Sequence, residues 1–159
     1  MRSTVIATRP DPIPAPLDRR AAAALIDTAI VLTVGYLATV EWGQPLPGGG
    51  KGWQGLEAIL MMVLTASYWV LPEWALGATL GKLLFGLRVV SVDGRKCSFS
   101  QSVKRNLLRI VDIQFFYLIG YTVARFTPKR QRIGDLWART MVVGPERDAA
   151  STPHGVTRI

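Results

Sequence analysis

The hydrophobic positions of this chain gather in two long stretches, each with the length of a membrane-spanning helix. Residues 21–40 read AAAALIDTAIVLTVGYLATV, and residues 55–72 read GLEAILMMVLTASYWVLP. A helix rises about 1.5 Å per residue, so roughly 20 apolar residues cover the hydrocarbon core of a bilayer. The pattern therefore predicts an all-α membrane protein with two full transmembrane helices.

A third apolar stretch, residues 107–124, is weaker because Arg109, Asp112 and Gln114 interrupt it. Basic residues lie on both sides of this stretch, and a full crossing would leave one basic cluster outside the cell. Short basic loops prefer the cytoplasm. We therefore favour a re-entrant helical hairpin, broken near Asp112 where protein shields the backbone. A third full span is the alternative.

Two further segments have the character of β-strands. Residues 87–92 read LRVVSV and precede Asp93-Gly94, a strong turn signal, and residues 140–143 read TMVV. Paired strands must lie on one side of the membrane, so the two segments predict a small cytoplasmic β-hairpin-like piece. Leucines at helical spacing around Lys82 predict a short interfacial helix just before it.

The basic residues determine the expected orientation. The chain has 19 Lys and Arg against 11 Asp and Glu, yet Lys51 is the only basic residue in the loop between the first two stretches. The positive-inside rule then places the N-terminus in the cytoplasm. Cations beside apolar spans also suit anionic lipids at the cytoplasmic face. We expect the lipid bilayer, and not nucleic acid, to be the partner of these charges.

The composition argues against several other functions. Cys97 is the only cysteine, which excludes a disulfide framework and a multi-cysteine metal site. We find no nucleophile–base pair, no cluster of metal ligands and no cofactor-binding loop. We therefore expect a protein that is not an enzyme and that needs no cofactor or metal.

The chain divides into three parts by composition. Residues 1–18 carry prolines at every second position from Pro10 to Pro16, a register that neither a helix nor a central strand tolerates. We expect a disordered cytoplasmic leader there, a membrane domain over residues 19–143, and a disordered tail over residues 144–159.

The most unusual residue of the first stretch is Asp27, because a charge at the centre of a spanning helix costs roughly 2.5–3.5 kcal/mol on insertion scales. Arg20 lies seven residues earlier, on nearly the same stripe of the helix and about 10 Å away along its axis. Asp27 either makes a structural hydrogen bond between helices or lines a polar path. Asp112 is the second polar interruption, while Glu73 is expected to be interfacial.

Four segments in this order resemble the RDD family of small bacterial membrane proteins, named for an arginine and two aspartates: RRAAAALID, TLGKLLFGLRVVSVDG, SVKRNLLRIVD and QRIGDLWARTMVV. The resemblance maps the arginine to Arg20, with Arg19 as the adjacent possibility, and the first aspartate to Asp27. The second aspartate is Asp112 or Asp135. The other motif positions serve structure: Gly81, Lys82, Gly86, Arg88, Asp93, Gly94 and Gly134.

The resemblance implies a protein of the bacterial inner membrane that transports an undefined ligand, with cation/proton exchange as one form of that activity. Two or three spans are too few to enclose a path in one protomer, so transport would need a homo-oligomer. The alternative is a scaffold that does not transport, in which the arginine and aspartates hold helices together while the basic cytoplasmic part binds lipid or a partner protein.

Overall fold

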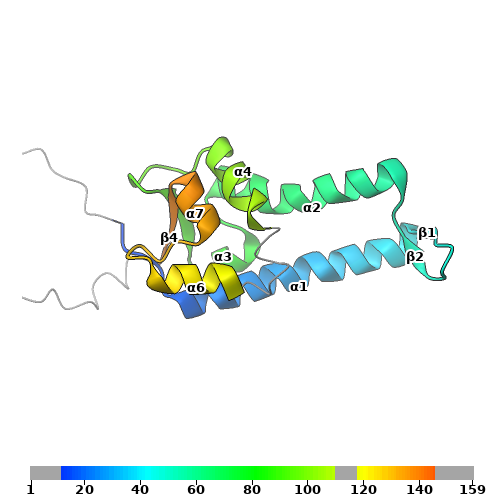
Figure 1. Cartoon of the computed structure of the whole chain (residues 1–159), viewed down its shortest axis with the longest axis horizontal. Helices are drawn as coiled ribbons and strands as arrows, with labels where there is room; N and C mark the ends of the chain where they lie inside the picture. Colours follow the sequence, from blue (N-terminus) through cyan, green and yellow to red (C-terminus); the bar gives the residue numbers. More distant parts are fainter. Residues whose placement is uncertain (1–11, 110–117, 146–159) are drawn as a thin grey trace, which may run out of the picture.

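The fold was obtained as a computed structural model, which describes residues 12–109 and 118–145. Two long helices, α1 (Leu17–Trp42) and α2 (Gly55–Leu76), extend together from one end of the molecule (Figure 1). Their far ends are joined through a short antiparallel hairpin formed by β1 (Gln44–Pro45) and β2 (Lys51–Gly52).

The two long helices have the length and composition of membrane spans. In the most apolar 18-residue segment of each helix, only 17% is buried within the protein for α1 and 6% for α2. A core helix of a water-soluble domain would instead bury its apolar face. Both predicted spans are therefore present as helices, and each is longer than expected. α2 continues one turn past Pro72 to Leu76 and is capped by Gly77, which adopts the left-handed conformation (φ 77°).

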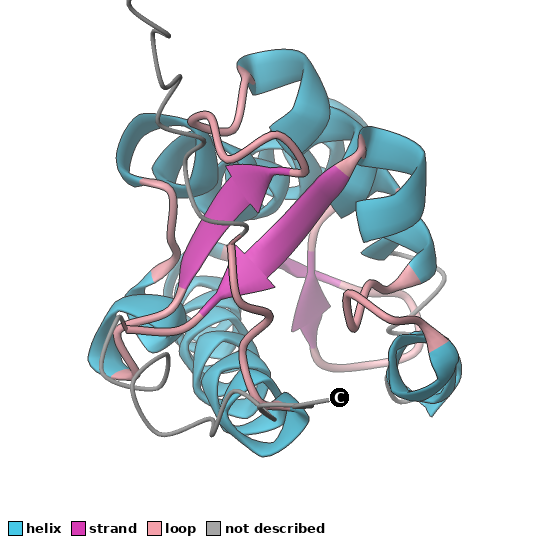
Figure 2. Ribbon diagram, turned by 90° about the vertical axis from the view of Figure 1, so that its left-hand side faces the viewer, coloured by secondary structure: helices cyan, strands magenta, loops and turns pink. Residues whose placement is uncertain are grey.

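All other described elements gather at the opposite end from the β1–β2 hairpin (Figures 1 and 2). They surround a two-stranded sheet that is seen face-on in Figure 2. In chain order they are α3 (Leu80–Leu84), β3 (Arg88–Ser91), α4 (Phe99–Leu107), α6 (Leu118–Phe126), α7 (Ile133–Ala138) and β4 (Thr140–Val143).

The sheet joins the two segments that the sequence suggested would pair. β3 and β4 run antiparallel, with Val89 opposite Val142 and Ser91 opposite Thr140. Gly94 has a φ of 78°, as the predicted turn after Asp93 requires. The chain between the two strands passes through α4, α6 and α7, so β3 and β4 pair without being joined as a hairpin. Val89 and Val142 of the sheet form the small hydrophobic core together with residues from neighbouring segments: Ala15, Ala23, Leu87 and Cys97.

The predicted leader is too long at its C-terminal end. Ala15 is 1% exposed, and its backbone N–H donates to the carbonyl oxygen of Val142 at 2.9 Å. α1 begins at Leu17, so residues 12–18 belong to the fold. Alternating prolines hold the backbone extended, and the free N–H of the residue between Pro14 and Pro16 can then extend the edge of β4.

The third apolar stretch is described only at its two ends. α4 and α6 both lie at the end of the molecule that holds the sheet (Figure 1). Asp112 and Gln114, at the proposed break of the helical hairpin, lie outside the described residues. Re-entry and full spanning therefore both stay predictions.

Candidate functional site

Asp27 lies at a junction of three elements and is 1% exposed. Its Oδ1 accepts hydrogen bonds from the Tyr68 hydroxyl at 2.7 Å and from the Gly81 backbone N–H at 2.8 Å. Its Oδ2 accepts one from the Thr79 hydroxyl at 2.5 Å. The three donors come from α2, from the residue before α3 and from α3 itself. The carboxylate therefore ties α1 to both of its neighbours.

Arg20 does not pair with Asp27 but with Asp135, which lies 115 positions later in the chain. The Arg20 Nη2 atom is 2.8 Å from Asp135 Oδ2, and its Nη1 donates to the carbonyl oxygen of Arg130. Arg19, the adjacent possibility, is half-buried. Of the two candidates for the second aspartate, the structure brings Asp135 to Arg20, while Asp112 lies outside the described residues.

Asp135 is fully buried and meets a second arginine from another helix. Arg105 Nη2 of α4 lies 3.0 Å from Asp135 Oδ1, and Arg132 Nε lies 3.8 Å from Oδ2. The backbone N–H of Arg132 also donates to Oδ2 at 3.2 Å. One carboxylate thus joins the start of α1, the middle of α4 and the start of α7.

Glu73 is the centre of a second buried group of charges, so at this end of the second span it is covered by protein and not exposed. It is 0% exposed and pairs with Lys82 Nζ, with Arg105 Nε at 3.2 Å and with Arg109 Nη2 at 3.7 Å. Asn106 donates to its Oε2 at 2.9 Å. Glu73 is buried because α2 continues past Pro72 and turns this residue toward α4. The i, i+4 spacing of Arg105 and Arg109 was the signal in the sequence that could have prompted a search for a buried acid.

These contacts join into one cluster, because Arg105 bridges the two carboxylates. Within the described residues, the cluster contains five basic side chains and two acidic ones. Buried ions are expensive unless they are paired, and each member of this cluster makes at least one ion pair. We call the following residues the charge network: Arg20, Glu73, Lys82, Arg105, Arg109, Arg132 and Asp135.

The network lowers the pKa of both Asp135 and Lys82, which favours the charged form of the acid and the neutral form of the lysine. Burial alone would raise the pKa of the Asp135 carboxyl, but the charges of Arg105, Arg132 and Arg20 outweigh burial and hold that pKa well below its usual range. Burial lowers the pKa of Lys82 to about 7, although the charge of Glu73 opposes the shift. Asp135 therefore stays ionised at physiological pH, whereas Lys82 titrates near neutrality.

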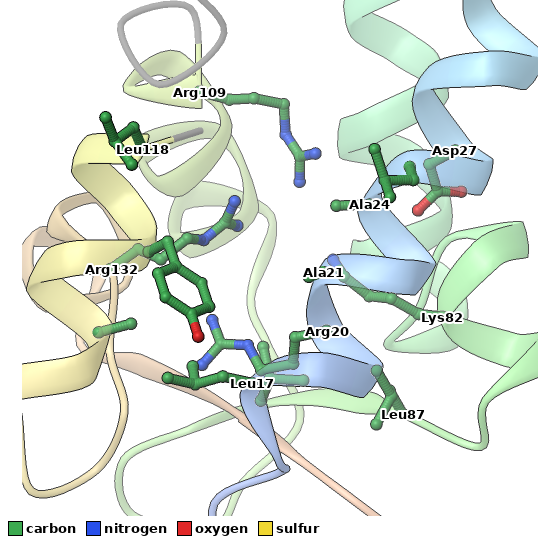
Figure 3. Close-up of a pocket in the computed structure, with 14 residues that line it drawn as sticks. Leu17, Arg20, Ala21, Ala24, Asp27, Lys82, Leu87, Arg109, Leu118 and Arg132 are labelled. Carbon is green, nitrogen blue, oxygen red and sulfur yellow. The ribbon is translucent and has the colours of Figure 1, made fainter. Parts of the chain in front are cut away.

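A pocket of about 270 Å³ opens beside this network (Figure 3). Arg20, Lys82, Arg109 and Arg132 line it together with Asp27, and we call it the basic pocket. In Figure 3, the guanidinium groups of Arg20, Arg109 and Arg132 project from different elements toward the same space, which faces α1. The remaining wall is apolar and comes mainly from α1 and α6: Leu17, Ala21, Ala24, Leu25, Leu118 and Tyr121.

A second and larger hollow, of about 750 Å³, lies farther along the two long helices. Its walls are mostly apolar, with Val31 and Gly35 on α1 and Met62 and Ala66 on α2. Arg109 lines both this hollow and the basic pocket, so the two are neighbours. α1 and α2 make few direct contacts with each other beside it.

Two of the motif glycines lie where helices approach most closely. A Cβ at Gly81 would lie 2.3 Å from the carbonyl oxygen of Ala23, and one at Gly134 would lie 2.6 Å from that of Arg105. Gly81 therefore allows α3 to reach α1, and Gly134 allows α7 to reach α4. Gly86 has a φ of 65° in the turn after α3.

The remaining motif residues lie away from the charge network. Arg88 is exposed on β3. Asp93 is also exposed in the turn after β3, where its Oδ2 lies 3.2 Å from Arg95 Nε. Neither residue lines the basic pocket.

Comparisons with curated proteins and with solved structures gave no match. The RDD family model, in contrast, matches residues 14–139, which is well over half of the chain. The match covers both long helices, the charge network and the start of the last helix–strand connection. The chain therefore belongs to the RDD family, and it is a membrane protein with two candidate spans.

Proposed function

We propose that this protein transports a small ligand across the bacterial cytoplasmic (inner) membrane and that the ligand binds in the basic pocket. Its N-terminus then lies in the cytoplasm, together with the sheet and the surrounding short helices. The positions of the basic residues support this orientation, because they concentrate at that end of the chain's two spans. The role is non-enzymatic and needs no cofactor.

The observation that carries the proposal is the position of the basic pocket. It lies where both candidate spans meet the cluster of short helices, and its volume of about 270 Å³ is near the lower end of small-ligand sites. Charged groups inside or directly beside membrane spans are costly to bury, so they are characteristic of ligand and ion pathways. A pocket that gathers four of them at the end of two spans is suited to take up a ligand from one side.

Lys82 is the best candidate for coupling ligand movement to protons. It lines the basic pocket, pairs with Glu73, and has a pKa lowered by burial to about 7. Asp27, which the sequence suggested for this role, already accepts three hydrogen bonds and is dry. The basic lining weighs against a cation as the ligand of this pocket.

Transport by this chain requires a homo-oligomer, because two spans cannot surround a path. The apolar hollow between α1 and α2 and the exposed large side chains on both helices support such an assembly. Leu32, Leu37, Leu60 and Leu64 are each more than half exposed to the bilayer or to another copy. Packing of a neighbouring copy against these faces would bring several basic pockets around one axis.

The test is flux in proteoliposomes that contain the full chain and a pH-sensitive dye. Gradients of Na⁺, K⁺ and Li⁺ chloride, and then of sodium phosphate, are imposed on the wild type and on two variants, Lys82→Gln and Asp27→Asn. We expect proton-linked flux in the wild type, its loss in Lys82→Gln, and its retention in Asp27→Asn. Arg125→Gln removes an exposed charge from α6 and serves as the matched control.

A scaffold without transport is the second candidate, and the saturated contacts of Asp27 favour it. In that role the charge network holds the short helices on the spans, while the basic surface binds lipid or a partner protein. Folded wild type that shows no flux under every gradient would contradict proton-coupled transport and leave the scaffold as the function. Flux that disappears only in Asp27→Asn would return the coupling role to Asp27.

A further inference from the structure

The short helices α4 and α7 carry their polarity in the opposite sense to helices of a water-soluble domain. Their inward sides bury polar and charged residues, among them Arg105, Asn106 and Asp135. Their outward sides are apolar, and the residues there are between 38% and 55% exposed: Phe99, Val103 and Leu107 on α4, and Ile133, Leu136 and Trp137 on α7. We call these six residues the outer face. An amphipathic helix in water turns its apolar side to the core, so the outer face suits an apolar surrounding.

The helix α3 repeats this arrangement. Gly81 and Lys82 are buried, whereas Leu80, Leu83 and Leu84 are exposed. The sequence predicts an interfacial helix here, and the same pattern recurs in α4 and α7, for which the sequence suggested no contact with the membrane. Three of the described short helices thus place polar groups inside and apolar side chains outside.

The lengths of the two spans place these helices at membrane depth. Residues 28–42 of α1, beyond Asp27, are roughly 22 Å long, and residues 55–68 of α2 are roughly 21 Å long. The hydrocarbon core of a bilayer is about 30 Å thick, so neither part crosses it alone. Roughly 8 Å of the crossing must therefore come from the parts of α1 and α2 that lie nearer the sheet.

These same parts of the spans are the ones that the short helices contact. The Gly81 backbone N–H of α3 donates to Asp27 on α1 at 2.8 Å. On α4, the Ser102 hydroxyl donates to the carbonyl oxygen of Val70 on α2 at 2.9 Å. α3 and α4 therefore lie level with the segments that complete the crossing, at the end of the molecule opposite the β1–β2 hairpin (Figure 1).

The outer face of α4 continues the exposed apolar surface of α2. Trp74 of α2 is 45% exposed and packs edge-to-face on Phe99, with ring centroids 5.6 Å apart. Val103 and Leu107 line the larger apolar hollow together with Met62 of α2. The surface therefore passes from the span onto α4 without a polar break, as it does where one medium covers both helices.

Exposed charges indicate where the surrounding medium changes to water. They include Asp93, Arg95 and Lys96 after β3, and Lys129 and Arg130 before α7. The Arg20 guanidinium at the start of α1 donates to the carbonyl oxygen of Arg130, so one of these charged turns lies level with the start of the first apolar stretch. Lys104 is exposed on α4, and its long stem can carry the ammonium group toward that boundary.

We propose that α3, α4 and α7 are immersed in the cytoplasmic leaflet of the bilayer, with the outer face against lipid acyl chains and the charge network as the polar interior of the immersed part. The partner of this surface is lipid, and not a soluble protein or a second copy of the chain. The inference goes beyond the proposed function, which requires only that this end of the molecule faces the cytoplasm.

Immersion is tested by spin labelling of the full chain in liposomes of phosphatidylcholine and phosphatidylglycerol. Single cysteines for the nitroxide are introduced by Leu107→Cys and Leu136→Cys, in a Cys97→Ala background because Cys97 is the only native cysteine. Leu64→Cys on the exposed side of α2 is the reference for lipid, and Asp93→Cys in the turn after β3 is the reference for water. Collisions of each label with oxygen, which concentrates among acyl chains, and with a water-soluble nickel chelate are measured by electron paramagnetic resonance.

We expect the ratio of oxygen to nickel collisions at Leu107→Cys to approach the ratio at Leu64→Cys. At Leu136→Cys the ratio should lie between the two references, since α7 is nearer the boundary. Ratios at both positions equal to that of Asp93→Cys overturn the inference. Low collision with both reagents and spin–spin broadening at Leu107→Cys also overturn it, because a second copy then covers the outer face.

A measurement without labels keeps the test independent of the Cys97→Ala background. Lipids brominated near the head-group end of the acyl chains quench tryptophans that touch them. Trp137 is 51% exposed on α7, so Trp137→Phe should remove part of the quenchable fluorescence of the wild type. A quenchable fluorescence equal in the two proteins shows that Trp137 does not touch lipid and overturns the immersion of α7.

Discussion

Replacing Asp27 by asparagine and by alanine tests whether the hydrogen bonds of its carboxylate stabilise the fold. Asparagine keeps one acceptor oxygen, which can still serve the Tyr68 hydroxyl and the Gly81 N–H. Its amide group takes the place of Oδ2 and faces Thr79, whose hydroxyl can turn to accept. Two charge-assisted bonds become neutral ones, at a cost of roughly 0.5–1.5 kcal/mol each. The expected loss in the free energy of unfolding is about 1–3 kcal/mol.

Alanine removes every acceptor at this junction. The Gly81 N–H and the fully buried Thr79 hydroxyl both lose their partner, while the half-buried Tyr68 can turn to its surroundings. Each buried donor left without a partner costs about 1–3 kcal/mol. Asp27→Ala should therefore lower the free energy of unfolding by about 2–6 kcal/mol, clearly more than Asp27→Asn.

The measurement is reversible unfolding in mixed micelles, followed by tryptophan fluorescence. Thr33→Ala, an exposed change on the same helix, is the control and should stay within about 0.5 kcal/mol of the wild type. If Asp27→Ala is as stable as this control, the hydrogen bonds at the junction contribute nothing to holding α3 on α1. If asparagine costs as much as alanine, the negative charge matters and the argument from hydrogen-bond acceptors is refuted.

Three further predictions follow from the network and its close contacts. Gly81→Ala places a Cβ 2.3 Å from the carbonyl oxygen of Ala23, so α3 must move away from α1; we expect a loss of about 1–3 kcal/mol, and an unchanged midpoint of unfolding would show that the contact yields freely. Glu73→Gln leaves buried cations with one acid fewer and should cost about 3–5 kcal/mol in the same assay, whereas the exposed Glu41→Gln should have little effect; equal midpoints would contradict a stabilising role for the buried acid. The pKa of Asp135 is held below its ordinary value of 3.8, so its stabilisation is complete above about pH 5, where the carboxyl is ionised in both the folded and the unfolded chain, and is lost as the pH falls through 3.8 and below. The midpoint of unfolding should therefore drop from about pH 5 downward, and Asp135→Asn should flatten this dependence.

The sequence was sufficient to predict the parts of the fold that depend on local pattern. The helices over residues 17–42 and 55–76 follow from two apolar stretches of spanning length. The strand character of residues 88–91 and 140–143 follows from their β-branched residues, and the turn at Gly94 follows from Asp93-Gly94. Each of these features is encoded in a short window, so the sequence pattern alone carries it.

The candidate site was harder to predict from the sequence because its contacts join segments that lie far apart along the chain. Spacing on one helix suggested that Arg20 faces Asp27, yet Arg20 turns to Asp135 on the last helix. Glu73 looked interfacial because it sits at the end of an apolar stretch, and only the position of α4 shows that this end is covered. Linear spacing gives the face of a helix but not the element that packs on that face.

The pair formed by Arg20 and Asp135 also sets an order on the synthesis of the protein. The two residues are separated by 115 positions, and ribosomes add about 5–20 residues per second, so the aspartate leaves the ribosome roughly 6–23 s after the arginine. Throughout that interval the first span must be held at the membrane with its arginine awaiting a partner. The ion pair between α1 and α7 therefore forms only after nearly the whole described chain has been made. A chain that stopped before α7 would lack the carboxylate that Arg20 contacts in the folded protein.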